Sequence, residues 1–307
     1  MNTKPSLFSR SAGFFLFILG VMFFQPGPAL PAGLTPLSAE PFVNQDADRT
    51  ALARELYELA RLDAFTRNTT SNIQEIILDL TSDQQDESFS AIILDAFNYE
   101  LMESVMLRSL SRSIREQQAA DAAAHLQLPE IRELTRLLYD NSTDFSDPET
   151  EADFQTYLLE AELNPEAFTE RIRLLSEILR VSQTARITVQ SIEDFLTIII
   201  FALNQTNSEE EQLNDRQLND LIISLRSNFR QLFDNVLLYV ALYATRYTDE
   251  AILEQHLHFL QSESGGWFIR AYNNAVLNGF GEVSEKVAAG LAARAIQQAQ
   301  DSDAFDD

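Results

Sequence analysis

The chain has 307 residues, a formal net charge of −25 and no cysteine. The lack of cysteine excludes disulfides, thiolate metal sites and a lipid-anchored N-terminus, and the lack of clustered Lys and Arg argues against nucleic acid as a partner. With 45% hydrophobic residues, the chain is long enough to bury the core of one large domain or of two smaller ones.

Residues 1–32 have the organisation of a secretory signal peptide. Lys4 and Arg10 are their only charges, an apolar run follows, and the segment QPGPALPAG supplies small residues for cleavage. We expect cleavage after Ala29, with Ala32 as the second choice. The alternative is an uncleaved anchor, although a membrane span needs about 20 apolar residues and this run is shorter. The sequence thus predicts a periplasmic or secreted protein with no membrane span after cleavage.

Beyond the leader, apolar residues recur three and four positions apart, which is the period of an α-helix, and no strand alternation is found. The sequence therefore predicts an all-α helical bundle. We expect a flexible linker over 33–45 and an acidic disordered tail over 300–307. The expected helices span 47–63, 66–80, 87–116, 129–140, 148–161, 165–182, 184–204, 209–246, 249–262 and 266–298, the last with breaks near Gly279 and Gly281.

Capping residues support two of these helix starts. Asn164 before Pro165 places a capping side chain ahead of a first-turn proline, and Ser208 with Glu211 forms a capping box. The helix that follows Ser208 carries the clearest apolar stripe, with four-three spacing from Leu218 to Tyr243. This stripe predicts either a coiled-coil dimer or, because further apolar residues widen it, the central helix of a bundle.

Comparison of the chain with itself suggests a tandem duplication. Residues 58–62 resemble 177–181, and residues 73–77 resemble 192–196 at the same offset. The alternative is coincidence, since amphipathic helices share a period by default. We expect two related helical halves, an N-terminal repeat over 46–162 and a C-terminal repeat over 163–299.

The histidines near the C-terminus do not form a metal motif. His256 and His258 are two residues apart, which on a helix separates their directions by about 200°, so they cannot chelate one ion together. A site of three histidines would also require His125. No nucleophile elbow, phosphate loop or dinucleotide fingerprint is found. We expect no metal, no cofactor and no catalytic residue.

A helix followed by Gly-Gly-Trp is the remaining local feature. Gly265 and Gly266 are expected to end the helix in a left-handed conformation. Ser262 is expected to cap backbone groups at that end. Trp267 is expected to pack against Phe259 and lock a helical hairpin, and the alternative is that Trp267 stacks on a ligand. These five residues form the candidate turn and ligand or partner contact.

This segment resembles the exported bacterial family catalogued as domain of unknown function 2059. The features that match are the start at Tyr247 and Thr248, the acidic helix, and the spacing from Phe259 through Ser262 to Gly265. Leu260 stands where the family usually has an aromatic residue. The resemblance implies an all-helical exported protein, with one or two copies of the family's unit, and it supplies no activity.

These observations favour a non-catalytic binding or scaffold protein of the cell envelope. Its partner would be an envelope protein or an apolar small ligand held in a groove between helices. One alternative is a hydrolase of envelope glycans that works with a pair of carboxylates. The other is a helical homo-oligomer, a homodimer in the simplest case, that associates through the stripe from Leu218 to Tyr243.

Overall fold

A computed structural model describes residues 45–81, 87–139, 147–183, 186–187, 190, 197 and 213–303. This part of the chain contains eleven α-helices and no strand, which confirms the all-α fold class. The predicted leader, most of the helix expected over 184–204 and the residues of the Ser208 capping box lie outside it. No described helix is both long enough and apolar enough to cross a membrane.

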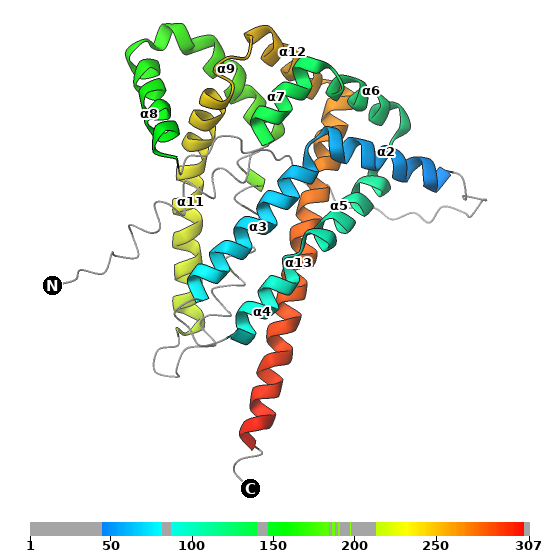
Figure 1. Ribbon diagram of the computed structural model, residues 1–307, viewed down its shortest axis with the longest axis vertical. Helices are drawn as coiled ribbons and strands as arrows, with labels where there is room; N and C mark the ends of the chain where they lie inside the picture. The colour runs from blue at the N-terminus through cyan, green and yellow to red at the C-terminus, as the bar shows by residue number, and fades with distance from the viewer. Residues whose placement is uncertain are drawn as a thin grey trace, which may run out of the picture.

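The helices keep the labels of Figure 1. In chain order they are α2 (Gln45–Leu59), α3 (Leu62–Thr81), α4 (Glu87–Ala96), α5 (Tyr99–Ser113), α6 (Glu116–Leu126), α7 (Pro129–Tyr139), α8 (Pro148–Leu163), α9 (Pro165–Ser182), α11 (Asp215–Ala244), α12 (Glu250–Gln261) and α13 (Glu263–Asp303).

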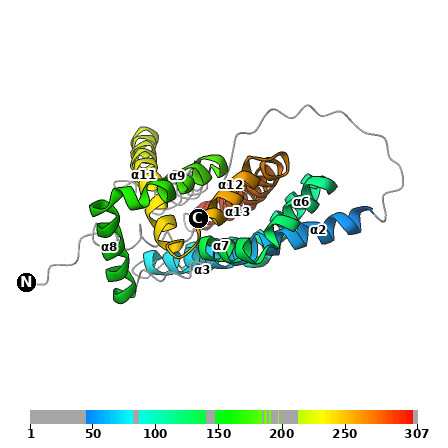
Figure 2. The same ribbon diagram turned by 90° about the horizontal axis from the view of Figure 1, so that it is seen from above.

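The long helix α13 is the element around which the others pack, and it runs down to the C-terminal end at the foot of Figure 1. Its principal neighbour is α5, and α4, α6 and α12 also contact it. Seen from above in Figure 2, α8, α9 and α11 lie on one side of α13, while α2 and α6 lie on the other. One buried cluster joins both sides, so helices of the two predicted repeats share a core. The duplication itself remains a prediction.

The apolar stripe on α11 is buried at both of its ends, and its C-terminal end belongs to this core. Leu218 and Ile222 are buried near the start of the helix, and Tyr243 is buried near its end. Tyr239 lies on the same predicted stripe but is 43% exposed, whereas the neighbouring Leu237 is buried. The face that packs within the chain is therefore wider than a two-residue seam, as expected for the helix of a bundle.

The helix predicted over 87–116 is two helices. The chain leaves α4 at Ala96 and re-enters a helix at Tyr99, because the Asn98 side chain accepts a hydrogen bond from the backbone N–H of Leu101 at 2.7 Å and caps α5. Another helix, α6, was not predicted at all. Its buried face consists mainly of alanines, which pack closely in a helix crossing but leave little trace in a pattern of large apolar residues.

The last helix was predicted with breaks that the structure does not have. α13 continues through Gly279 and Gly281 without interruption, and it extends to Asp303, into the segment expected to be a disordered tail. At Gly279 the reason for glycine is space, since an added Cβ atom would lie 2.9 Å from the terminal methyl carbon of Met106 on α5. This glycine allows close approach of two helices and does not break one.

The proline-marked starts of α8 and α9 agree with the prediction, although one capping side chain does not. Pro165 occupies the first turn of α9, but Asn164 makes no capping hydrogen bond with its side chain. Its backbone N–H instead closes the end of α8 by donating to the carbonyl of Glu160. Asn164 is thus the single residue between the two helices and serves both as the end of α8 and as the start of α9.

Candidate functional site

The predicted turn between α12 and α13 is built on Ser262 and not on the two glycines. Ser262 ends α12, and its hydroxyl donates to the carbonyl of Phe259 at 2.6 Å and accepts from the N–H of Gly265 at 3.0 Å. Gly265 and Gly266 lie in the first turn of α13, and neither has a positive φ. The expected left-handed helix end is therefore wrong, because one serine side chain closes both helices.

Trp267 lies in the core and not on a ligand surface. It is 4% exposed, and its indole N–H donates to the carbonyl of Ser113 at the end of α5 over 3.0 Å. The aromatic contact to Phe259 comes from the next residue, Phe268, with ring centroids 6.2 Å apart. Trp267 thus joins α13 to α5, and the burial of its ring leaves no face for ligand stacking.

We expect Trp267→Phe to lower the free energy of unfolding by about 2 kcal/mol. The variant leaves the partly buried Ser113 carbonyl without its donor, and an acceptor left unsatisfied away from water costs about 1–3 kcal/mol. Urea unfolding followed by circular dichroism measures the change. Tyr239→Phe, which removes a polar group from a half-exposed aromatic residue on α11, is the matched control and should unfold at the wild-type midpoint.

Two of the three histidines meet across α6 and α12. Nε2 of His125 lies 3.1 Å from Nδ1 of His256, and the His125 ring stacks on Phe259 with centroids 4.0 Å apart. Burial lowers the pKa of both imidazoles. His258 is exposed on another face of α12. Among the described residues, no three histidine, aspartate or glutamate side chains gather as a metal site would require.

A cleft with a volume of about 870 Å³ lies between α2, α3, α5 and α7. We call it the arginine cleft. Its arginines are Arg54, Arg61, Arg67, Arg132 and Arg136. Its acidic residues are Glu55, Glu58, Asp63, Glu103 and Glu133. The lining is thus mainly charged, which differs from the apolar groove expected between helices.

Contacts on α5 hold one wall of the arginine cleft in place. The Tyr99 hydroxyl donates to Oε1 of Glu103 at 3.1 Å, and Arg54 donates to the same oxygen at 3.4 Å. The guanidinium of Arg67 lies over the Tyr99 ring, 5.1 Å from its centroid. Burial and the neighbouring Glu103 carboxylate raise the pKa of Tyr99, so its hydroxyl stays protonated and remains a donor.

On α7, the opposite wall, one arginine is paired and another is not. Arg136 binds Glu133 with two hydrogen bonds, of 2.8 and 2.6 Å, and this contact lowers the pKa of the Glu133 carboxyl. Arg132, one turn earlier, is exposed, and its guanidinium makes no hydrogen bond or ion pair with any described residue. Arg132 is therefore a cation that faces the cleft and is available to a ligand.

Arg61 enters the cleft from a strained position. It lies between α2 and α3 with a φ of 58°, in the left-handed region that glycine occupies without cost. A residue with a side chain costs about 1 kcal/mol or more in this conformation. The Arg61 side chain lines the cleft.

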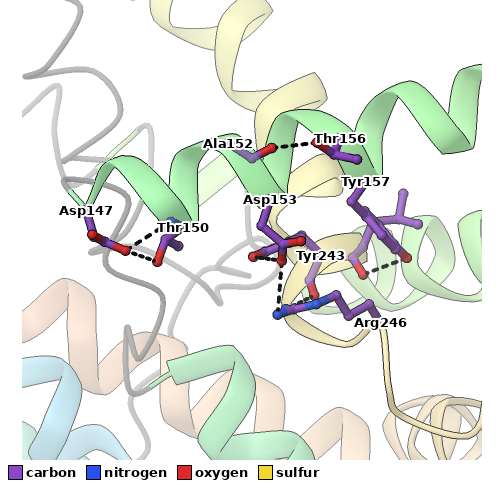
Figure 3. A network of polar contacts seen from close by, with 9 residues as sticks. Asp147, Thr150, Ala152, Asp153, Thr156, Tyr157, Tyr243 and Arg246 are labelled. Carbon is purple, nitrogen blue, oxygen red and sulfur yellow. Dashed lines mark hydrogen bonds and ion pairs between the residues drawn. The ribbon is translucent and has the colours of Figure 1, made fainter.

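A second polar network lies where α8, α9 and α11 meet, and Figure 3 shows part of it. The Tyr243 hydroxyl donates to Asp153 at 2.6 Å, and Arg246 approaches the same carboxylate at 3.6 Å. Burial and Asp153 raise the pKa of Tyr243 to about 12. Arg171 donates to the carbonyls of Thr245 and Thr248 at 2.6 and 2.7 Å. This network closes the end of α11, and among its groups only Nε of Arg246 is buried without a hydrogen-bond partner in the described structure.

No family model, curated protein or solved structure matches this chain. The resemblance to the family of domain of unknown function 2059 therefore remains a prediction. The residues that carry it lie in two places: Tyr247 is 87% exposed after α11, whereas Ser262 lies between α12 and α13 and binds Gly265 in the first turn of α13.

Sequence reasoning did not find the arginine cleft. Its arginines come from three helices and one turn, and no spacing along the chain brings them together. A usable signal was the scarcity of cations, since Lys and Arg together number 22 against 47 acidic residues. In a chain with so few cations, the repeated arginines within residues 54–67 are a signal for a cationic part of the surface.

Proposed function

We propose that the protein is an exported, non-catalytic binding protein whose ligand enters the arginine cleft. The observation that carries the proposal is a cleft of about 870 Å³ whose polar groups are already held in position. Ligand sites commonly have volumes of roughly 300–1,000 Å³ with a few oriented polar groups. Tyr99, Glu103 and Arg54 provide such an arrangement without a ligand.

The chemistry of the cleft favours binding over hydrolysis. A glycan hydrolase needs one carboxyl group that stays protonated near neutral pH, which requires a raised pKa. Arg136 has the opposite effect on Glu133, whose pKa it lowers. Oε1 of Glu103 accepts hydrogen bonds from two donors, Tyr99 and Arg54, so this oxygen is already occupied. These two acids of the cleft are thus suited to ionic contacts.

A thermal-shift screen tests the proposal. We expect at least one compound in a panel of amino acids, short peptides, sugars, sugar acids and dicarboxylates to raise the melting temperature. At a concentration of 100 Kd a ligand stabilises by about 2.7 kcal/mol. Arg132→Gln should remove the shift, whereas Arg216→Gln, an exposed arginine on α11, should retain it.

Two results would overturn the proposal. The first is turnover of ester, phosphoester, glycan or peptide substrates by the purified protein, since that would make it an enzyme. The second is a panel in which no compound shifts the melting temperature. Export is tested separately, by fractionating cells and measuring the mass of the mature N-terminus, which should correspond to cleavage after Ala29 or Ala32.

The homo-oligomer remains the second candidate. Ile223 on α11 is 62% exposed and Tyr239 is 43% exposed, so part of this helix faces away from the core. The stripe itself favours a single chain, because Leu218, Ile222 and Tyr243 are buried within it. Light scattering at high concentration distinguishes the two: a monomer rules out the assembly function.

A further inference from the structure

We infer that the arginine cleft binds a ligand with a carboxylate and an ammonium group, namely a free amino acid or a short peptide. This inference rests on the proposed function and names the ligand class for the same cleft. It depends on the balance of charges in the lining and on two side chains, Arg132 and Asp63, whose polar atoms lack partners within the described structure.

The charge balance excludes simpler ligands. Five arginines and five carboxylates line the cleft, so its formal charge is zero in a chain of charge −25. A site for an anion alone would need an excess of arginine, and a site for a cation alone would need an excess of acid. A lining with positive and negative charges is complementary to a ligand that carries one positive and one negative group.

The one aromatic ring on the α5 wall is not free to stack on a sugar. Arg67 already covers the Tyr99 ring at 5.1 Å from its centroid, and the Tyr99 hydroxyl is used by Glu103 at 3.1 Å. Sugar sites commonly use open aromatic faces for stacking, and this wall offers a guanidinium in place of such a face. The wall therefore favours ionic contacts over a neutral glycan.

Arg132 supplies the contact for a carboxylate. Its guanidinium lies on the α7 wall, is exposed, and has no partner among the described residues. Planar guanidinium groups bind carboxylates through two parallel hydrogen bonds, which gives orientation as well as attraction. No competing acid holds this side chain away from an incoming carboxylate.

Asp63 supplies the contact for an ammonium group. It lies in the first turn of α3 on the cleft lining, and its Oδ1 atom is shielded from solvent without a hydrogen-bond partner in the described structure. A shielded carboxylate oxygen without a donor is unfavourable, so an N–H donor that satisfies it has a free-energy advantage. We infer that a ligand ammonium is the donor that this carboxylate lacks.

The turn between α2 and α3 places a guanidinium and a carboxylate close together on the cleft lining. Arg61, in its left-handed conformation, is two residues before Asp63, and both line the cleft. A guanidinium and a carboxylate thus enter from the same short segment, facing Arg132 on α7. We infer that the strained backbone at Arg61 is retained because it directs this pair of charges into the ligand site.

The test uses four dipeptides, Ala-Ala, Ala-Glu, Ala-Lys and Ala-Phe, titrated by calorimetry into the purified full-length protein. Each is compared with its N-acetylated form, which has no N-terminal ammonium group, and with its C-terminal amide, which has no C-terminal carboxylate. We expect at least one free dipeptide to bind, and each blocked form of that dipeptide to bind at least tenfold more weakly.

Two variants assign the two ends of the ligand. Arg132→Gln should remove the preference for the free dipeptide over its amide, and Asp63→Asn should remove the preference over the acetylated form. Arg216→Gln on α11 is the matched control and should preserve both preferences. Circular dichroism and the melting temperature of each variant show whether it is folded, and Arg132 is exposed, so its replacement leaves the core intact.

Three outcomes overturn the inference. Equal binding of the acetylated form shows an anion site, equal binding of the amide shows a cation site, and no binding of any dipeptide shows another ligand class. The proposed function survives each of these if some other compound raises the melting temperature and Arg132→Gln removes that shift. If no compound of any class does so, the inference and the proposed function fall together.

Discussion

We expect Gly265→Ala to lower the free energy of unfolding by about 3 kcal/mol or more, which is among the largest effects available to a single methyl group. An added Cβ atom would lie 1.8 Å from the carbonyl oxygen of Phe259, 2.6 Å from its carbonyl carbon and 2.7 Å from Cα of Leu260. All three are backbone atoms, so no side chain can rotate away. Relief requires α12 and α13 to separate, which disturbs the hydrogen bonds at Ser262.

Gly281→Ala is the matched control for this variant. Gly281 lies within α13 with no heavy atom within 4 Å of its added Cβ atom. Alanine is more favourable than glycine in a helix interior by about 0.5–1 kcal/mol, so this variant should be slightly more stable than wild type. Urea unfolding measured by circular dichroism gives both values. A Gly265→Ala protein that unfolds at the wild-type midpoint would contradict the close packing at this turn.

The turn at Ser262 illustrates what the sequence predicts and what it does not. A glycine pair after an amphipathic helix has two physical explanations, a left-handed helix end or a close approach of two backbone segments. Both explanations predict the same amino-acid sequence. The structure has the second, because the Ser262 hydroxyl closes α12 and begins α13 at once. Sequence thus located the turn within three residues but assigned its conformation to the wrong residues.

Sequence signals predicted a helix correctly where the contacts that stabilise the helix are between residues close together in the chain. The proline of α9 marks a helix start, and the expected helix over 165–182 is confirmed with the same bounds. The split at Asn98 was missed because capping by asparagine competes with helix continuation, and the outcome depends on how α4 and α5 pack. α6 was missed because its alanines become a buried face only against α2 and α13.

The arginine cleft could not be predicted from the local sequence pattern. Arg54, Arg67 and Arg132 each appear in the sequence as solvated charges on helices, which is the usual role of such residues. Their convergence follows from the packing of α2, α3, α5 and α7, and packing is a long-range property of the fold. Only the left-handed φ of Arg61 sets one of them apart, and no sequence pattern reports it.

Acidification from pH 7 to pH 5 is expected to destabilise the protein through the pair of His125 and His256. Burial and, to a smaller extent, the proximity of His125 lower the pKa of His256 to about 3, and burial lowers the pKa of His125 to about 4. In the unfolded chain both return to about 6.5. Below that pH the unfolded chain takes up protons that the folded protein does not, so stability is lost as the pH falls.

The change of the unfolding free energy with pH is large enough for equilibrium unfolding to detect. A buried histidine that stays neutral in the folded state contributes up to about 1.4 kcal/mol per pH unit below its unfolded pKa, or about 2 kcal/mol for His256 between pH 6.5 and pH 5. His125 is only partly buried, so its contribution is smaller. Carboxyl groups in the unfolded chain titrate mainly below pH 5, so they contribute little over this range.

The sign of this effect separates the histidine pair from the general electrostatics of the chain. Lowering the pH reduces the negative charge of a protein at −25, which weakens self-repulsion and should stabilise the folded state. A loss of stability toward pH 5 therefore points to buried bases. His256→Gln should flatten the dependence, while His258→Gln, which changes an exposed residue two positions along the same helix, should leave it as in wild type. A wild-type unfolding free energy that is constant or rises toward pH 5 would contradict a neutral pair held between α6 and α12.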